Sequence, residues 1–308
     1  MRHIASLFIV IALVGACGSE PEVSPPTGGG GASADFPVTI ETAAGPVVID
    51  ERPDRIVSLS PTATEMLFAI DADDQVVAVD DQSNFPPSVP TTDLSGFEPN
   101  IEAIASYEPD LVVASDGNAL KGLKKLKIDL LVQPAATVLD DTYQQIEDLG
   151  AATGQVDGAT ALVASMKEDI TEIVAGVPDL EKAPTYYHEL DDTYFSVTSE
   201  TFIGQVYDLV GLKNIADKAK GAGTGYPQLS SEYIIQANPD FVFLADTKCC
   251  NQNASTVADR PGWKQLDAVQ DDRVVELDDD IASRWGPRVV DLLTIVVDAI
   301  EGSSLGSM

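Results

Sequence analysis

Histidine is scarce in this chain of 308 residues, which contains only His3 and His188. A Ser-His-Asp catalytic site would have to use His188, and no serine stands out as its partner. The phosphate-loop motif G-x-x-x-x-G-K-[ST] is absent as well. Receptors for free zinc or manganese gather several histidines and acids around the ion, which this composition does not favour. The sequence therefore predicts a protein that is not an enzyme and has no metal site or cofactor of its own.

Positively charged residues are also few. The chain has 18 lysines and arginines against 50 aspartates and glutamates, which gives a formal net charge of −32. This excess of negative charge excludes binding to nucleic acid or anionic lipid through bulk electrostatics. It is typical of a solvated extracellular surface or of a protein with a cationic partner.

The apolar run at the N-terminus is too short to span a bilayer. Residues 4–14 form it, whereas a transmembrane helix needs about 20 apolar residues. The run leads through small residues to Cys17, and this segment resembles a bacterial lipobox. The resemblance implies a lipoprotein signal peptide over residues 1–16 and a diacylglycerol on Cys17; an ordinary signal peptide with a chance cysteine is the alternative. Residues 17–35, rich in Gly, Pro and Ser, predict a flexible tether. We expect an exported protein that is lipid-anchored to the outer face of the cell membrane.

The only other cysteines, Cys249 and Cys250, are adjacent. An exported protein lies where disulfides persist. A disulfide between the two, intermolecular pairing and two free thiols are all open alternatives. With no histidine nearby, the pair does not predict a zinc site.

Two segments of the chain have nearly the same sequence. The first runs from Pro99 to Asp116 and the second from Gln228 to Asp246. In each, a glutamate is followed two residues later by isoleucine and seven residues later by Pro-Asp, and then by an apolar run that ends at an aspartate. A unit that recurs once, at half-chain distance, predicts two similar lobes with something held between them.

The apolar pattern predicts α/β lobes with parallel sheets. Short β-branched or aromatic runs at residues 55–59, 111–113 and 241–244 predict buried strands. Helical segments alternate with them, which is typical of a parallel sheet with helices on its faces. Residues 157–177 instead predict one long helix, because apolar residues recur there at three- and four-residue steps.

We expect this long helix to bridge an N-terminal lobe over residues 36–156 and a C-terminal lobe over residues 178–308. A helix of this length measures roughly 30 Å. The alternative is a surface helix that belongs to one lobe.

Taken together, several segments resemble the solute-binding proteins of ABC importers for cobalamin, ferric siderophores and heme. They are Arg55 to Pro61 with Thr64 and Glu65, Asn84 to Pro87, Asn100 to Val113, Val210 to Ile215, Leu229 to Val242, and Ser283 to Arg288. The resemblance covers residues 38–300. It implies two Rossmann-like lobes with parallel sheets, bridged by one long α-helix, and a ligand cleft between them. It also implies an ABC permease dimer with its ATPase as partner, a small-molecule ligand, no nucleic acid and a monomeric protein.

The resemblance further implies two surface glutamates, one per lobe, that dock onto arginines of the permease. The internal repeat places Glu102 and Glu232 at those positions. Two acids at helix N-termini of similar lobes present a spaced anionic pair to a two-fold-symmetric cationic partner. The alternative is that each glutamate only complements the dipole of its own helix.

In such folds the ligand lies beyond the carboxyl ends of the strands, on the loops that follow them. The candidate ligand-binding residues on these loops are Ser60, Thr62, Gln82, Phe85, Phe97, Tyr187, Tyr226, Arg284 and Trp285. An aromatic-lined cleft suits a large, flat, partly apolar ligand; core packing is the alternative for each aromatic. Arg284, beside Trp285, is the strongest candidate for a polar ligand contact.

The small number of cations argues against strongly anionic ferric catecholates as ligands. We therefore expect cobalamin or a related large metal chelate, with a ferric siderophore or heme as the alternative. His188 could contact a ligand or a metal, although a lone histidine is more often a structural hydrogen-bonding residue. A non-transport sensor or adhesin, or a hydrolase, would be the alternatives from other classes.

Overall fold

The structure is a computed structural model that describes residues 35–43, 45–180 and 182–303. The predicted signal peptide, Cys17 and nearly all of the predicted tether lie outside the described residues. No helix in the described part of the chain is long and apolar enough to cross a membrane.

The first lobe is built on a four-stranded parallel sheet. Its strands are β3 (Ile56–Leu59), β4 (Val76–Val79), β5 (Leu111–Ala114) and β6 (Asp129–Val132), in the order β4-β3-β5-β6. Every residue of β3 and β5 is buried, as expected for central strands covered on both faces. An antiparallel hairpin of β1 (Val38–Thr42) and β2 (Gly45–Ile49) precedes the sheet.

The helices of this lobe begin at sequence-coded caps. Ser60 accepts a hydrogen bond from the Ala63 amide at the start of α1 (Pro61–Ala69), and Pro61 occupies the first turn. Asn100 caps α2 (Ile101–Ala105) by accepting from two amides. The remaining helical elements are α3 (Leu139–Thr153) and the 3-10 turns η1 (Asp73–Gln75), η2 (Asn118–Leu120) and η3 (Leu123–Leu126).

The second lobe repeats the topology of the first. Its strands are β7 (Thr185–Glu189), β8 (Lys213–Asn214), β9 (Phe241–Leu244) and β10 (Val274–Glu276), all parallel, in the order β10-β9-β7-β8. Numbered along the chain within each lobe, both sheets have the order 2-1-3-4. The two copies of the sequence repeat supply the helix and the third strand of each sheet, α2 with β5 and α6 with β9. The predicted pair of similar lobes is confirmed.

The helical elements of the second lobe are short until the last. They are α5 (Phe202–Asp208), η4 (Ile215–Lys218), η5 (Ala222–Thr224), α6 (Ser231–Ala237), α7 (Ala254–Asp259), η6 (Trp263–Gln265), α8 (Asp267–Gln270), α9 (Asp279–Ser283) and α10 (Val289–Glu301).

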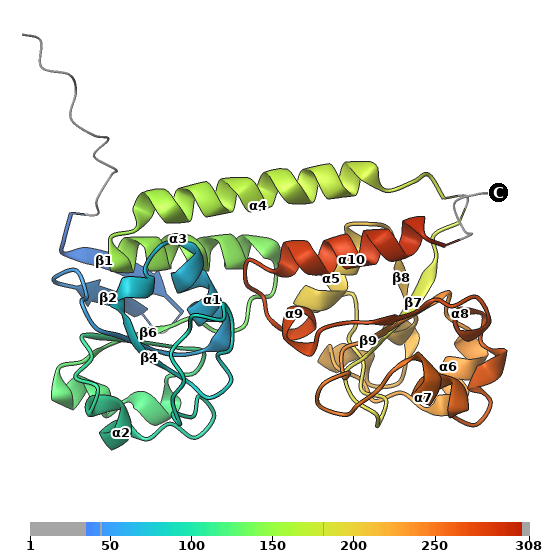
Figure 1. The fold of residues 1–308 in the computed structure, drawn as a ribbon, viewed down its shortest axis with the longest axis horizontal. Coiled ribbons are helices and arrows are strands. Elements are labelled where there is room, and N and C mark those ends of the chain that lie inside the picture. Colours follow the sequence, from blue (N-terminus) through green and yellow to red (C-terminus); the bar gives the residue numbers. More distant parts are fainter. Residues whose placement is uncertain (1–34, 44, 181, 304–308) are drawn as a thin grey trace, which may run out of the picture. The chain divides into compact units, whose positions relative to one another are not determined.

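The long helix α4 (Val156–Gly176) connects the lobes, and it begins and ends one residue before the predicted range. It runs along α3 of the first lobe and α10 of the second (Figure 1). Its buried residues are Ala159, Val163, Met166 and Ile170, which recur at helical spacing on one face. The largest hydrophobic core contains this face together with apolar residues of both sheets. The predicted fold class, two parallel-sheet lobes bridged by one long helix, is confirmed.

Candidate functional site

A cavity of about 430 Å³ lies where loops of both lobes meet. The loops that follow β3, β4 and β5 form its first-lobe side, and the segment around α9 forms the other side. This is the edge of the sheets at which ligands bind in open parallel α/β folds. The lining residues are Leu59, Ser60, Pro61, Thr62, Asp80, Gln82, Gly96, Phe97, Ser115, Asp116, Asp280, Ser283, Arg284 and Trp285.

Six of the nine predicted ligand-binding residues line this cavity. They are Ser60, Thr62, Gln82, Phe97, Arg284 and Trp285. Phe97 is 88% exposed, so its ring extends the apolar wall of the cavity into solvent.

The other three predicted residues lie elsewhere. Tyr187 is fully buried in the core of the second lobe, with its ring 6.2 Å from that of Trp263. We expected it on a loop, but β7 continues to Glu189 and keeps it inside the sheet. Phe85 stacks under the guanidinium of Arg288, 4.3 Å from the ring centroid. Tyr226 is 51% exposed and does not line the cavity.

The guanidinium of Arg284 is bound by protein groups. One terminal nitrogen donates to Glu65 Oε1 at 2.7 Å and to Asn84 Oδ1 at 2.9 Å. The other donates to Asp280 Oδ1 at 2.8 Å and to the carbonyl of Gln82 at 3.0 Å. Arg284 therefore lines the cavity without presenting an unpaired charge to it, and its contact with a ligand stays a prediction.

Glu65 is the centre of an ion cluster that joins the lobes. It lies in α1 of the first lobe and is 3% exposed. Besides Arg284, it accepts hydrogen bonds from Arg288 at 2.9 Å to Oε2 and 2.5 Å to Oε1. Both arginines belong to the second lobe, so one buried carboxylate pairs with two cations across the interface. The sequence offered no signal for this role, because the partners are more than 200 residues apart.

Trp285 is also held by hydrogen bonds between the lobes. Its indole Nε1 donates to Gln145 Oε1 at 3.0 Å, and its carbonyl accepts from Thr142 Oγ1 at 2.9 Å. Both partners belong to α3. Asn84 adds a further link by donating to Asp280 Oδ2 at 2.9 Å. The second-lobe wall of the cavity is therefore fixed to the first lobe by polar contacts.

Asp80 is the buried acid of the cavity. It follows β4 directly and is 3% exposed. Its Oδ1 has no hydrogen-bond partner among the described residues. Burial raises the pKa of the Asp80 carboxyl above its usual range; hydrogen bonds from Ser83 and the charge of Arg284 oppose this rise, and Asp81 adds to it.

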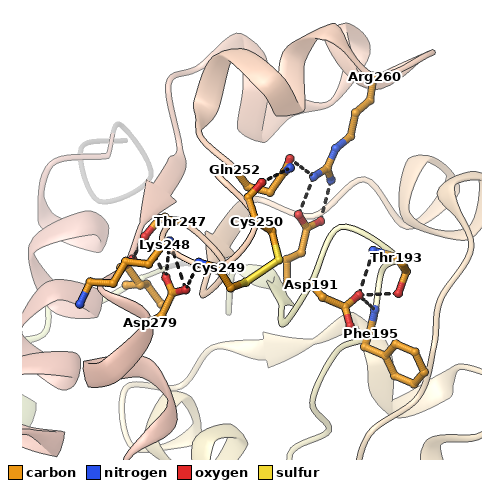
Figure 2. Close-up of a disulfide and its surroundings, with 12 residues drawn as sticks. Asp191, Thr193, Phe195, Thr247, Lys248, Cys249, Cys250, Gln252, Arg260 and Asp279 are labelled. Carbon is orange, nitrogen blue, oxygen red and sulfur yellow. Dashed lines mark hydrogen bonds and ion pairs between the residues drawn. A yellow bond between two sulfur atoms is a disulfide. The ribbon is translucent and has the colours of Figure 1, made fainter. Parts of the chain in front are cut away.

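Cys249 and Cys250 form a disulfide with each other in the loop that follows β9 (Figure 2). Asp279, the first residue of α9, binds this loop. Its carboxylate accepts from the amide of Cys249 at 2.9 Å and from the amide of Lys248 at 3.0 Å. Because α9 leads into the cavity wall, these hydrogen bonds link the disulfide loop to that wall. The sequence left three alternatives open for these cysteines, and the structure contains the intramolecular disulfide.

A second group of charges is linked to the disulfide loop through Gln252, which accepts a hydrogen bond from Arg260 at 2.7 Å and donates one to the carbonyl of Cys250 at 3.1 Å. Arg260 donates to both carboxylate oxygens of Glu189, at 2.6 and 2.5 Å. Both carboxylate oxygens of the neighbouring Asp246 lack a hydrogen-bond partner in the described part of the chain. Burial raises the pKa of Asp246 to about 8, and the charge of Glu189 adds to this rise.

His188 is a structural residue of the second lobe. It is fully buried, and its Nδ1 lies 2.8 Å from the hydroxyl of Tyr207. Burial lowers the pKa of His188 to about 3, so the ring is neutral at physiological pH. Within residues 35–43, 45–180 and 182–303, no group of three or more His, Cys, Asp or Glu residues could hold a metal ion.

The repeat glutamates occupy equivalent places in the two lobes. Glu102 lies in the first turn of α2, and Glu232 lies in the first turn of α6. Both are exposed, and each precedes the third strand of its sheet. The sequence therefore identified two acids with the same structural position.

The Pro-Asp of each repeat has a role that we did not predict. Asp110 Oδ2 accepts from the amide of Arg55 at 3.0 Å, just before β3. Asp240 Oδ2 accepts from the amide of Thr185 at 2.7 Å, at the start of β7. In each lobe the aspartate links the start of the first strand to the start of the third. It therefore recurs because it holds the two strands of each sheet together.

Comparisons with known proteins agree with this architecture. The chain is 31% identical over 277 residues to an uncharacterised ABC transporter substrate-binding lipoprotein of Bacillus subtilis (strain 168), covering 86% of each protein. It is 29% identical over 285 residues to a cobalamin-binding protein of Halobacterium salinarum (strain ATCC 29341 / DSM 671 / R1), covering 89% of this chain and 76% of that protein.

A solved structure is similar along its whole length. It is described as that of a possible iron-binding (periplasmic solute-binding) protein from Staphylococcus epidermidis ATCC 12228. The TM-score is 0.71 and the identity 26%, over 81% of this chain and 99% of that one. The family model described as periplasmic binding protein matches residues 56–281, which include both sheets. The chain belongs to the periplasmic binding protein family.

Proposed function

We propose that this chain is the extracytoplasmic solute-binding subunit of an ABC importer. It captures cobalamin or a related large metal chelate between its lobes and delivers it to the permease. The observation that carries the proposal is the cavity at the carboxyl ends of two parallel sheets, with Phe97 and Trp285 on its walls. Family membership supports the same role, because the family consists of solute-binding proteins.

The lining of the cavity favours an uncharged or weakly charged ligand. Its one arginine, Arg284, is paired with Glu65 and Asp280. Three carboxyl groups, those of Asp80, Asp116 and Asp280, line the cavity as well. Anionic ligands would therefore meet no unpaired cation among the lining residues. The cobalamin-binding relative of Halobacterium supports a corrinoid. A ferric siderophore or heme is the second candidate, since aromatic walls suit any large flat chelate.

Two further parts of the chain complete the proposed subunit. Glu102 and Glu232 would dock onto basic residues of the permease, one from each lobe. The lipoprotein relative supports a lipid anchor on Cys17, which would follow a signal peptide over residues 1–16 and hold the protein at the outer face of the membrane. The domains would be a tether over residues 17–35, lobes over residues 36–156 and 178–308, and the bridging helix between them.

Native mass spectrometry of the purified protein tests the proposal first, because a tightly bound chelate would co-purify with it. Fluorescence titration against cyanocobalamin, a ferric hydroxamate and hemin then ranks the candidates. We expect a one-to-one complex, tightest with cyanocobalamin. Failure of all three ligands to bind would contradict the proposed ligand class.

A further inference from the structure

The cavity contains one polar atom that the protein leaves unsatisfied. Asp80 Oδ1 is buried in the lining and has no hydrogen-bond partner in the described part of the chain. An unpaired buried polar group costs roughly 1–3 kcal/mol, and buried polar atoms without partners are rare in folded proteins. A group from the ligand could remove this cost.

The surroundings of Asp80 place its carboxyl close to the main chain. A side-chain carbon added at Gly96 would lie 2.7 Å from Asp80 Oδ2 and 2.8 Å from the carbonyl of Leu59. The absence of a side chain at Gly96 therefore keeps space beside the carboxyl. Both residues line the cavity.

The charges around Asp80 are predominantly negative. Asp81 follows it on the same loop, Asp116 comes from the loop after β5, and Asp280 comes from the second lobe. Arg284 is the one cation among the lining residues, and its terminal nitrogens are occupied by Glu65, Asp280 and two further oxygens. Like charges and burial both favour the neutral form of a carboxyl group.

We propose that Asp80 is a specificity-determining residue of the cleft, which in its neutral form donates a hydrogen bond to an amide or carbonyl oxygen of the ligand. This inference rests on the proposed function, because it assumes that the ligand occupies this cavity. It narrows the ligand class to molecules with amide groups on their periphery. A ligand that carries carboxylates there would be repelled by the surrounding aspartates, and the repulsion increases when Asp80 ionises.

The protonation state gives the proposal a signature that a purely structural role lacks. A neutral carboxyl donates a hydrogen bond, whereas a carboxylate only accepts one. Ligand affinity should therefore fall as the pH rises through the titration of Asp80, by up to about tenfold per pH unit for one linked proton. Asparagine keeps a donor at this site and does not titrate.

The test is a titration of the full mature chain with cyanocobalamin, which carries peripheral amides, between about pH 5 and pH 9. The wild type should lose affinity as the pH rises. Asp80→Asn should abolish that dependence and bind more tightly than the wild type at the alkaline end. Asp80→Ala, which has no donor, should bind roughly two- to tenfold more weakly than the wild type at the acidic end. Asp74→Asn makes the same change of charge at an exposed residue before the other end of β4 and should keep the wild-type profile.

Two outcomes separate this inference from the proposed function. If cyanocobalamin binds but Asp80→Asn and the wild type show the same pH profile, the role of Asp80 is refuted and the importer function stands. If cyanocobalamin, the ferric hydroxamate and hemin all fail to bind, the proposed ligand class fails. Carboxyl NMR of the ligand-free protein tests the neutral form directly, because an Asp80 that titrates near the ordinary aspartate pKa of about 3.9 would overturn it. Tighter binding of hemin than of cyanocobalamin at neutral pH would overturn the ligand class.

Discussion

At the scale of single residues, the interface between the lobes depends on Glu65. Its carboxylate is buried and pairs with Arg284 and Arg288. Breaking a buried ion pair by removing one partner leaves an uncompensated charge, which typically costs about 3–5 kcal/mol. Loss of the Glu65 carboxylate alone would therefore destabilise the interface between the lobes.

Glu65→Gln should lower the free energy of unfolding by about 3–5 kcal/mol, because the buried Arg284 and the partly buried Arg288 lose their counter-charge. Urea unfolding followed by circular dichroism measures this change. Glu98→Gln is the matched control, since Glu98 is exposed; it should stay within about 0.5 kcal/mol of the wild type. Equal stabilities of the two variants would show that the cluster contributes little.

Asp246 makes stability depend on pH. Burial and Glu189 raise its pKa to about 8 in the folded protein, whereas an unfolded aspartate titrates near about 3.9. Between these values the folded state holds a proton that the unfolded state has lost. The contribution of Asp246 to stability is therefore fully present at acidic pH and is lost as the pH rises towards about 8.

Asp246→Asn should gain stability relative to the wild type as the pH rises from about 4 to about 8, by at most about 1.4 kcal/mol per pH unit. Above that range the difference should become constant. Urea unfolding of both proteins across the range measures it. Asp272→Asn, at an exposed position, should run parallel to the wild type. A difference between Asp246→Asn and the wild type that does not change with pH would refute a raised pKa at Asp246.

Residue roles were predictable from the sequence only where the signal was local. The repeat identified Glu102 and Glu232, and loop position identified six of the fourteen residues that line the cavity. The partners of Arg284 could not be predicted, because ion pairing joins segments that are distant in the sequence. Tyr187 was misplaced because it lies inside strand β7 and not on the loop that follows it.

At the scale of elements, α4 determines how the lobes are connected. Near its start, Gly158 lies against α1, and a side-chain carbon there would be 2.6 Å from the carbonyl oxygen of Ile70. At its end, Gly176 has nothing within 4 Å of the same position. Substitutions of the two glycines therefore allow a close-packed site and an open site on one helix to be compared.

Gly158→Ala should destabilise the protein by about 1–3 kcal/mol, because the backbone of α1 or α4 must shift to make room. Gly176→Ala should instead be neutral or stabilising by up to about 1 kcal/mol, since alanine is the better helix former. Thermal and urea unfolding of both variants measure the contrast. Equal effects at the two sites would mean that the start of α4 is not packed tightly against α1.

Most elements follow from local patterns in the sequence. The range of α4 was predicted to within one residue because its apolar spacing runs between two clear boundaries. The buried strands were predicted from short β-branched runs. The 2-1-3-4 strand order could not be predicted from these runs, because strand pairing depends on contacts between segments that are far apart. The disulfide was also undecided, since adjacency in the sequence does not determine the pairing of cysteines.

At the scale of the whole molecule, two equivalent lobes present equivalent acids. Glu102 and Glu232 lie at the starts of corresponding helices and are exposed. A spaced pair of charges suits a partner built from two identical halves. In the proposed function, docking and ligand capture would use different surfaces and could be separated by mutation.

Glu102→Ala combined with Glu232→Ala should abolish uptake of labelled cyanocobalamin by cells that express the importer, while the ligand affinity of the purified protein stays unchanged. Exposed acids outside the cavity lining should not affect binding, but under the proposed docking role their loss would remove the contacts with the permease. Glu108→Ala with Glu276→Ala removes two other exposed acids and should leave uptake intact. Normal uptake with the first pair would contradict the docking role.

The most direct test of the central claim, that the cleft between the lobes holds the ligand, is calorimetric titration with cyanocobalamin. The wild type should bind one equivalent. The double variant Phe97→Ala with Trp285→Ala should lose at least about tenfold in affinity, because two aromatic walls are removed. Tyr226→Ala, a half-exposed aromatic outside the cavity, should bind like the wild type. Undiminished binding by the double variant would contradict this account of the ligand site.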